Sequence, residues 1–354
     1  MDITKIDPNF KLQTCAGQEN VAFYDVRQSP FAIYGLYRSR TETCFKRMPD
    51  EVAKSVSDGV ASLYTNTAGG RVRFQTDSPF LAIKAQMPDV CRWFSHMSLL
   101  GSSGFDVYEY QDGVYTFINS LRPPVDMTDG FEGFIELGAQ KLRDITIHFP
   151  SYNNVTNLFV GLDKDAKLQE GERYRPIAPI VYYGSSITQG GCASRPGNSY
   201  QNFILRNNHI DYINLGFSGN CKAEQEMARY IAGMDMSVFV CDYDHNAPNA
   251  DHLRKTHAPF FHTFRQAQPD TPVIFVSRPD FKGSAEDIAR RNIVMATFQN
   301  AKEHGDKNVY YIDGEKLFEG EERGCCTVDG CHPNDIGFYR MAAVIGAKIE
   351  EALA

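Results

Sequence analysis

The sequence lacks the features that would place the protein in a membrane or on a nucleic acid. No apolar run approaches the roughly 18 residues that a membrane-spanning helix needs. Residues 1–7 contain no basic segment followed by an apolar stretch, which predicts a cytoplasmic protein unless a leader has been removed. The net charge of -8 and the pI near 5.6, with scattered lysines and arginines, predict neither a nucleic-acid nor a membrane partner.

Disulfide and metal signatures are also weak. The nine cysteines are odd in number and unevenly spread, which favours free thiols over a disulfide framework. Cys325, Cys326, Cys331 and His332 could form a zinc site, but no second Cys-x-x-Cys pair accompanies them. We therefore expect no metal and no cofactor. The oligomeric state is left open.

The 354 residues have an ordinary globular composition, 42% hydrophobic and 23% charged, and their number suggests two domains. In residues 1–175, short alternating segments separated by turn signals predict an antiparallel, jelly-roll-like β-sandwich. The expected strands are 71–76, 80–85, 105–110, 114–118, 134–137 and 144–149. Residues 50–63 carry apolar residues at helical spacing, although a loop with one helical turn would also fit.

A polar, proline-containing junction at 171–176 separates this half from residues 176–354, where the pattern changes. Buried strands are expected at 180–183, 212–215, 238–241, 273–276 and 309–312. Helices are expected between and after them, at 223–232, 251–268, 284–304 and 333–352. This alternation predicts a parallel sheet with helices on both faces.

The first of these buried strands leads into the segment 184–188, Gly-Ser-Ser-Ile-Thr. A hydroxyl on a tight turn at the end of a buried strand lies at the edge where α/β sheets bind ligands. Ser186 is therefore a candidate nucleophile. The alternative is a plain turn, since glycine and serine are common turn residues.

Ser186 would need a base and an orienting group, and the loop before the last helix offers both. Asp329 and His332 are three residues apart there. His332 would take the Ser186 proton, and Asp329 would hold the imidazole and stabilise its charged form. Because the base must be neutral, activity is expected to fall at acid pH. Alternatively, Asp329 lies in an ordinary turn and His332 at the start of a helix, with its side chain in solvent.

An oxyanion intermediate also needs hydrogen-bond donors, and two strand ends could supply them. Gly219 follows the second strand of the parallel sheet and could donate its N–H. Asn246 follows the third strand and could donate its side-chain amide, with Asn249 as its rival. Ser186, Gly219, Asn246, Asp329 and His332 would all lie at the carboxyl edge of one sheet.

These four segments in this order resemble the SGNH hydrolases, also called the GDSL esterase/lipase superfamily. The resemblance covers residues 177–354 and implies a flavodoxin-like three-layer α/β/α fold and a serine esterase mechanism. It also implies an oxyanion hole made by the Ser186 N–H, the Gly219 N–H and the Asn246 side chain. The sequence departs from the family at Ser185, where aspartate is commoner, and around Asn246, where the usual Gly-x-Asn-Asp frame is missing.

Residues 101–108 resemble the Gly-x-Asp-Leu-Tyr motif of N-terminal domains attached to some SGNH hydrolases. This two-domain layout is similar to carbohydrate acetyl esterases, which implies hydrolysis of O-acetyl or other short acyl esters of carbohydrates. A small-molecule or lipid esterase and an inactive glycan-binding protein are the alternatives. Arg195, His245 and Trp93 are candidate substrate contacts, although Trp93 could instead serve the core.

Overall fold

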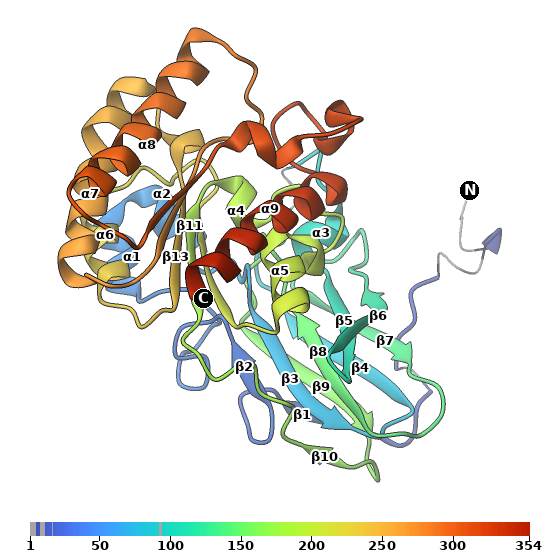
Figure 1. Ribbon diagram of the computed structural model, residues 1–354. Helices are drawn as coiled ribbons and strands as arrows, with labels where there is room; N and C mark the ends of the chain where they lie inside the picture. Colours follow the sequence, from blue (N-terminus) through green and yellow to red (C-terminus); the bar gives the residue numbers. More distant parts are fainter. Residues whose placement is uncertain (1–4, 8–10, 16, 92–93) are drawn as a thin grey trace.

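The computed structural model describes residues 5–7, 11–15, 17–91 and 94–354. An N-terminal β-sandwich and a C-terminal α/β domain lie side by side in it (Figure 1). Within the described ranges, the helices are all too short or too polar to span a bilayer. The predicted fold class is confirmed, whereas the boundary at 175/176 stays a prediction.

Two antiparallel sheets form the sandwich, with apolar side chains such as Phe74, Ile83 and Ile147 packed between them. One sheet has the order β1-β9-β4-β7 and consists of β1 (Val21–Asp25), β9 (Asn157–Asp163), β4 (Phe80–Gln86) and β7 (Gly130–Glu136). The other has the order β10-β3-β8-β5-β6, with β2 beside β3, and consists of β10 (Leu168–Gln169), β3 (Arg71–Thr76), β8 (Arg143–His148), β5 (Phe105–Gln111), β6 (Val114–Leu121) and β2 (Ala32–Tyr34).

The six strands expected in this half are all present, within a few residues of their predicted bounds. The hairpin between β5 and β6 shows why its turn was readable from the sequence. Asp112 and Gly113 both have positive φ, +52° and +83°, as a type I′ turn requires. The sequence analysis missed β1, β2, β9 and β10. Of these, β1, β2 and β10 are edge strands. Their residues are less buried, so apolar and polar residues alternate less clearly along them.

The C-terminal domain has a five-stranded parallel sheet in the order β12-β11-β13-β14-β15, which is the flavodoxin-like order. Its strands are β11 (Ile180–Gly184), β12 (Tyr212–Gly216), β13 (Val238–Asp242), β14 (Val273–Val276) and β15 (Val309–Ile312), each at its predicted place. One face is covered by α6 (Gln225–Ala232), α7 (Ala250–Ala267) and α8 (Ala285–Glu303). The other face is covered by α5 (Tyr200–Asn208) and α9 (Asp335–Leu353).

Local chemistry sets the helix ends. The Ser284 and Asp287 side chains form a capping box at the start of α8, as their spacing predicts. Two predicted starts are wrong by two residues. Ala223 has a φ of +57°, which no helical residue adopts, so α6 begins at Gln225. Asn334 caps α9 through its side-chain oxygen, so Pro333 precedes the helix.

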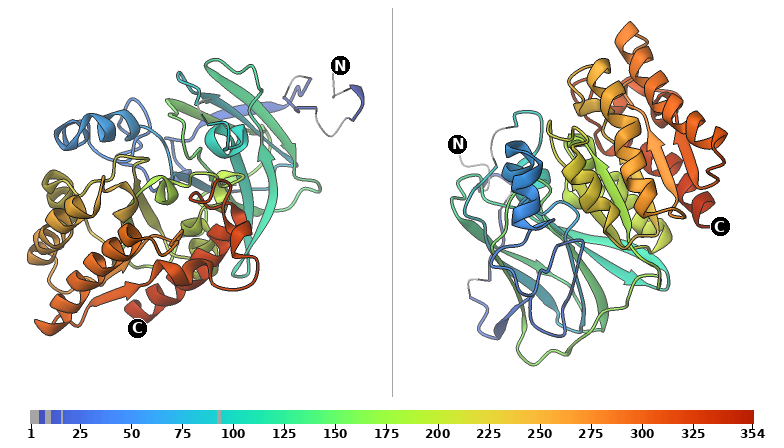
Figure 2. Two further views of the ribbon diagram at one scale, coloured as in Figure 1. Left: turned by 90° about the horizontal axis from the view of Figure 1, so that it is seen from above. Right: turned by 90° about the vertical axis from the view of Figure 1, so that its left-hand side faces the viewer.

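Residues 50–63 form two short helices, α1 (Asp50–Val56) and α2 (Asp58–Leu63). Ser57 separates them and caps α2, because its hydroxyl accepts the Val60 N–H at 3.3 Å. Both helices bury apolar side chains in the core of the C-terminal domain, where α1 contacts α6 (Figure 2). A segment of the N-terminal half thus completes the layer of helices on the α6–α8 face.

The remaining short elements lie in loops around the carboxyl edge of the parallel sheet or at the domain junction. They are α3 (Leu99–Ser103), α4 (Ser186–Gln189), η3 (Pro196–Asn198), η4 (Asp244–Asn246), η5 (Gly314–Phe318) and η6 (Arg323–Cys326).

Candidate active site

The candidate nucleophile stands on the sharp turn between β11 and α4. Ser185 caps α4, since its buried hydroxyl accepts a backbone N–H at 3.2 Å, and Ser186 is the first helical residue. At Gly184 a Cβ atom would lie 2.0 Å from Thr188 Oγ1 and 2.5 Å from the Asp242 carbonyl oxygen. Only glycine fits so tight a turn, which brings the half-buried Ser186 to the edge of the sheet.

A continuous chain of hydrogen bonds joins Ser186 to the loop before α9. Ser186 Oγ lies 2.9 Å from His332 Nε2, and His332 Nδ1 lies 2.7 Å from Asp329 Oδ2. With the ring proton on Nδ1, facing the carboxylate, Nε2 is free to accept the Ser186 proton. The structure therefore brings together the three residues predicted to act in series.

The spacing of three residues between Asp329 and His332 has a local cause. Asp329 Oδ1 accepts the backbone N–H groups of Cys331 at 2.9 Å and His332 at 2.7 Å, while Oδ2 holds the imidazole. Gly330 makes the turn with a φ of +81°. Partial burial alone would raise the pKa of Asp329, but these hydrogen bonds lower it to about 2. The carboxylate is therefore charged near neutral pH.

The predicted oxyanion donors lie on two adjacent loops. Gly219, with a φ of +70°, is on the loop after β12, and open space surrounds the position of a Cβ there. Asn246 ends η4 after β13, and its Oδ1 accepts the Cys221 N–H at 3.3 Å. This contact links the two loops and leaves the Asn246 amide N–H groups for another acceptor.

Asn249, the rival of Asn246, has a different position. It is exposed and caps α7, since its Oδ1 accepts the His252 N–H at 2.8 Å. A side chain held at a helix cap has less freedom to reach a substrate. The geometry therefore favours Asn246.

His245 was expected to line the mouth of the site, but its side chain is only 6% exposed. Its Nε2 lies 3.1 Å from Asp280 Oδ1, and its Nδ1 lies 3.9 Å from Cys331 Sγ. Burial alone would lower the pKa of His245, but Asp280, Cys331 and Asp244 raise it to about 10. A charged imidazole thus connects the segment after β13 to the loop that carries His332. The role of His245 as a substrate contact stays a prediction.

Arg195 is at the domain junction. Its Nη1 lies 2.7 Å from Asp106 Oδ2 and 2.6 Å from Tyr108 Oη, both in the sandwich motif singled out from the sequence. The buried Asp106 also accepts the Gly197 N–H with both carboxylate oxygens, at 3.1 Å each. These contacts give Arg195 a role in joining the two domains, and its role as a substrate contact stays a prediction. Trp93 lies outside the described residues.

The four residues weighed as a zinc site are dispersed. Cys326 is buried and its Sγ lies 3.4 Å from Arg340 Nη1, whereas Cys325 is exposed beside Glu322. Cys331 faces His245. Among the described residues, these four do not form one metal-binding group.

Sequence reasoning missed three side chains that the sandwich contributes to the site. Tyr152 Oη donates to the Ser186 carbonyl oxygen at 3.1 Å. The His96 ring lies 5.4 Å from the His332 ring, and Phe94 packs edge-on against Tyr152 with the ring centres 5.1 Å apart. They come from loops of another domain, so no spacing relative to Ser186 could have revealed them.

A cavity of about 530 Å³ opens beside these rings. Phe94 and Tyr152 line it together with polar side chains that include Asn66, Asp89 and Asn154. Gln189 of α4 donates to Asn66 Oδ1 at 3.0 Å, so the cavity wall is anchored to the helix that begins at Ser186. Its lining residues come from α2, the sandwich loops and the segment after β8, all in the N-terminal half of the chain, and none of the candidate catalytic residues is among them.

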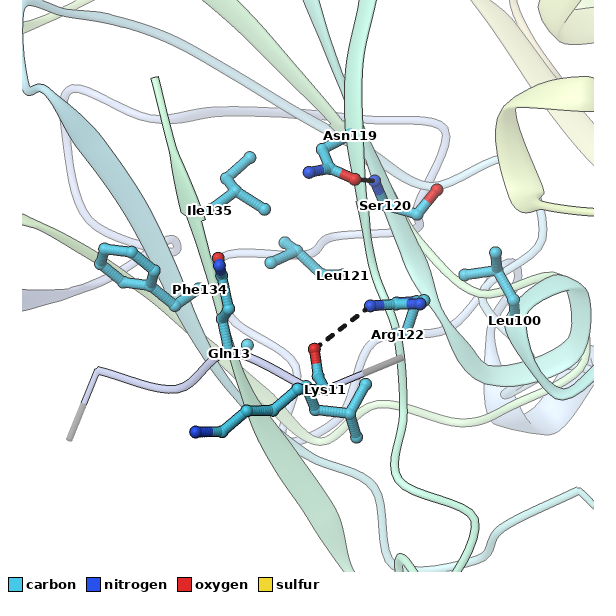
Figure 3. Close-up of a pocket in the computed structure, with 11 residues that line it drawn as sticks. Lys11, Gln13, Leu100, Asn119, Ser120, Leu121, Arg122, Phe134 and Ile135 are labelled. Atoms are coloured by element: carbon cyan, nitrogen blue, oxygen red, sulfur yellow. Dashed lines mark hydrogen bonds between the residues drawn. The ribbon is translucent and has the colours of Figure 1, made fainter. Parts of the chain in front are cut away.

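A second cavity, of about 450 Å³, lies within the sandwich between β6, β7 and the segment around Lys11 (Figure 3). None of the predicted site residues lines it. Its polar contacts, such as Arg122 Nη2 to the Lys11 carbonyl at 3.4 Å, tie the N-terminal segment to the sheet.

Two family profiles match the chain. Residues 177–350 match the GDSL-like lipase/acylhydrolase family, and residues 21–168 match the N-terminus of SGNH-hydrolase-type esterases. No curated protein matches the sequence. The two profiles correspond to the two halves whose resemblances the sequence had indicated.

Solved structures share the architecture over nearly the full length. A presumed GDSL-like lipase from Bacteroides ovatus is 28% identical, with a TM-score of 0.85 over 94% of this chain and 98% of that one. A salicylyl-acyltransferase from a tetracycline biosynthetic pathway is 18% identical, with a TM-score of 0.75 over 94% and 97%. An acetyl xylan esterase from Butyrivibrio proteoclasticus is 13% identical, with a TM-score of 0.57 over 94% and 98%. The last two likenesses show the fold alone.

Proposed function

Since this chain belongs to the GDSL-like lipase/acylhydrolase family, we propose that it is a serine esterase that hydrolyses short-chain acyl esters of carbohydrates, O-acetyl esters above all. Ester hydrolysis follows from the family, whereas the roles of the individual residues and the substrate class are proposed here. The observation that carries it is the hydrogen-bond chain from Ser186 through His332 to Asp329 at the edge of the sheet.

In the proposed reaction, His332 Nε2 removes the Ser186 proton as Oγ attacks the ester carbonyl carbon. Asp329 stabilises the imidazolium that forms. The N–H groups of Ser186 and Gly219 and the amide of Asn246 donate to the oxyanion. His332 then protonates the leaving alcohol. A water molecule, deprotonated by the same imidazole, releases the acid and restores Ser186.

The cavity lined by Phe94 and Tyr152 supports a polar alcohol as the leaving group. Amide and carboxylate side chains next to two aromatic rings, Phe94 and Tyr152, offer hydrogen bonds to hydroxyls and apolar faces to sugar rings. A long acyl chain would need an extended apolar channel instead. The likeness to an acetyl xylan esterase supports the acetyl group by analogy only.

A series of p-nitrophenyl esters tests the chemistry and the acyl length together. We expect acetate to be strongly preferred over octanoate, and Ser186→Ala to abolish turnover. Ser55→Ala, at an exposed serine of α1, is the matched control and should keep full activity. A preference for octanoate would point to a lipid esterase, and substantial turnover by Ser186→Ala would remove Ser186 from the mechanism.

Mass spectrometry of acetylated oligosaccharides before and after treatment tests the substrate class. Loss of acetyl groups with release of acetate supports the proposal. Transfer of the acyl group to an added alcohol instead of water would indicate an acyltransferase. Binding of the glycans without turnover of any ester would indicate an inactive glycan-binding protein.

A further inference from the structure

Three metal-binding side chains meet beside Ser186, although they come from different parts of the chain. A ring nitrogen of His96, the sulfur of Cys192 and a ring nitrogen of His332 all lie within 4.8 Å of one another. His96 belongs to the sandwich, Cys192 follows α4, and His332 precedes α9. The His96 side chain is 36% exposed and the His332 side chain 24%, so an ion can reach the cluster from solvent.

The donor set suits zinc. Thiolate and imidazole are its preferred protein ligands, at about 2.3 Å and 2.0–2.1 Å. A tetrahedral zinc keeps such ligands roughly 3.3–3.8 Å apart, so inward movements of about an ångström would close the present cluster around an ion. Asp329 Oδ2, 4.0 Å from His96 Nε2, or a water molecule would complete the coordination.

We propose that His96, Cys192 and His332 form a Zn²⁺ site and that zinc bound there inhibits the enzyme reversibly. On binding, the Cys192 thiol releases its proton to solvent and its sulfur bonds the metal. His332 gives one nitrogen lone pair to zinc. The base that Ser186 requires is thereby removed, whichever ring nitrogen binds. The inhibition rests on the proposed function, whereas metal binding does not.

The packing of the two domains places the Cys192 sulfur in this cluster. The residue is 7% exposed, so few other positions are open to its sulfur. It lies against Met97 and Tyr152, so the sandwich helps to hold it near His332.

A second cluster, His245, Asp280 and Cys331, also meets the geometric requirement, but its charges are already paired. Asp280 is bound by Arg278 at 2.7 Å as well as by His245 at 3.1 Å. A cation there would have to displace or approach two positive groups. The cluster of His245, Asp280 and Cys331 is therefore not expected to bind a metal ion, and it serves as the control for the proposed site.

Co²⁺ titration of the purified protein tests binding without using activity. Cobalt takes the place of zinc at such sites, and a cobalt–thiolate bond gives an intense near-ultraviolet absorption. We expect this absorption in the wild type and in the variant Cys325→Ser. The Cys325 thiol is exposed and contacts Glu322, not a member of the cluster. It should be lost in Cys192→Ser and in Cys192→Ala. Absence of the band from the wild type, its survival in both Cys192 variants, or its loss only in Cys331→Ser would overturn the proposal.

Zinc inhibition of ester turnover tests the consequence. Half-inhibition should require about tenfold or more zinc in Cys192→Ser and His96→Ala than in the wild type, and a chelator should restore activity. His304→Ala removes an exposed histidine and should leave the inhibition unchanged. Equal sensitivity of all variants would disprove the site. If no ester is turned over at all, the proposed function fails, and the cobalt titration still decides the metal site.

Discussion

The phenol of Tyr152 donates a hydrogen bond to the carbonyl oxygen of Ser186 across 3.1 Å, although the two residues belong to different domains. Burial raises the pKa of Tyr152 well above its ordinary value, so the phenol keeps its proton. Gly191 closes the same corner, since a Cβ there would lie 2.8 Å from Tyr152 Oη and 3.0 Å from the Ser186 carbonyl oxygen. The sandwich therefore helps to fix the backbone that carries the candidate nucleophile.

Tyr152→Phe should lower kcat more than it raises KM, with kcat reduced by about three- to tenfold. The change removes one hydrogen bond of about 1 kcal/mol but keeps the ring. Steady-state kinetics on a p-nitrophenyl ester measures this, and Tyr339→Phe, at an exposed site, is the control. A lower melting temperature with unaltered kinetics would show that Tyr152 only stabilises the junction.

Asn246→Ala should reduce kcat by about 10²–10³, because an oxyanion donor is lost from the transition state. Asn249→Ala should instead cost about 1 kcal/mol of stability through the lost cap of α7, with kcat little changed. Kinetics and thermal unfolding of both variants separate the two roles. A larger loss of kcat in Asn249→Ala would transfer the oxyanion role to Asn249.

Arg195→Ala should destabilise the protein by about 3 kcal/mol and leave KM unchanged. Removal of the guanidinium leaves the buried Asp106 with one charged partner fewer. Arg175→Ala breaks the exposed pair with Glu350 and should cost under about 1 kcal/mol. Urea unfolding measures both. A raised KM without loss of stability would support Arg195 as a substrate contact.

His245→Gln should change how stability depends on pH. Folding raises the pKa of His245 to about 10, whereas an unfolded histidine titrates near 6.5. Between these values the folded protein holds a proton that the unfolded chain releases, so this contribution is complete below about pH 6.5 and is lost as the pH rises toward 10.

The stability advantage of the wild type over His245→Gln should therefore shrink by on the order of 2 kcal/mol between about pH 6.5 and pH 9. Urea unfolding at several pH values measures the difference. His304→Gln, at an exposed site, should follow the wild type throughout. Parallel pH profiles for the wild type and His245→Gln would mean that His245 is not charged in the folded protein.

The sequence by itself determined the elements whose signals are local. The strands of the parallel sheet are short apolar runs between polar turns, so their places and the flavodoxin-like fold could be predicted. The candidate triad was also readable. Ser186 follows a strand that ends in an obligatory glycine, and Asp329 and His332 share one hydrogen-bonded turn.

Only the tertiary structure decided which side chains of the two domains contact each other at the site. Tyr152 reaches Ser186 and His96 reaches His332 through contacts between segments far apart in the chain, and no spacing rule describes such a meeting. For the same reason His245 and Arg195, read as substrate contacts, proved to have charged partners in Asp280 and Asp106. Burial and ion pairing are properties of the folded chain, since they depend on which distant groups surround a side chain.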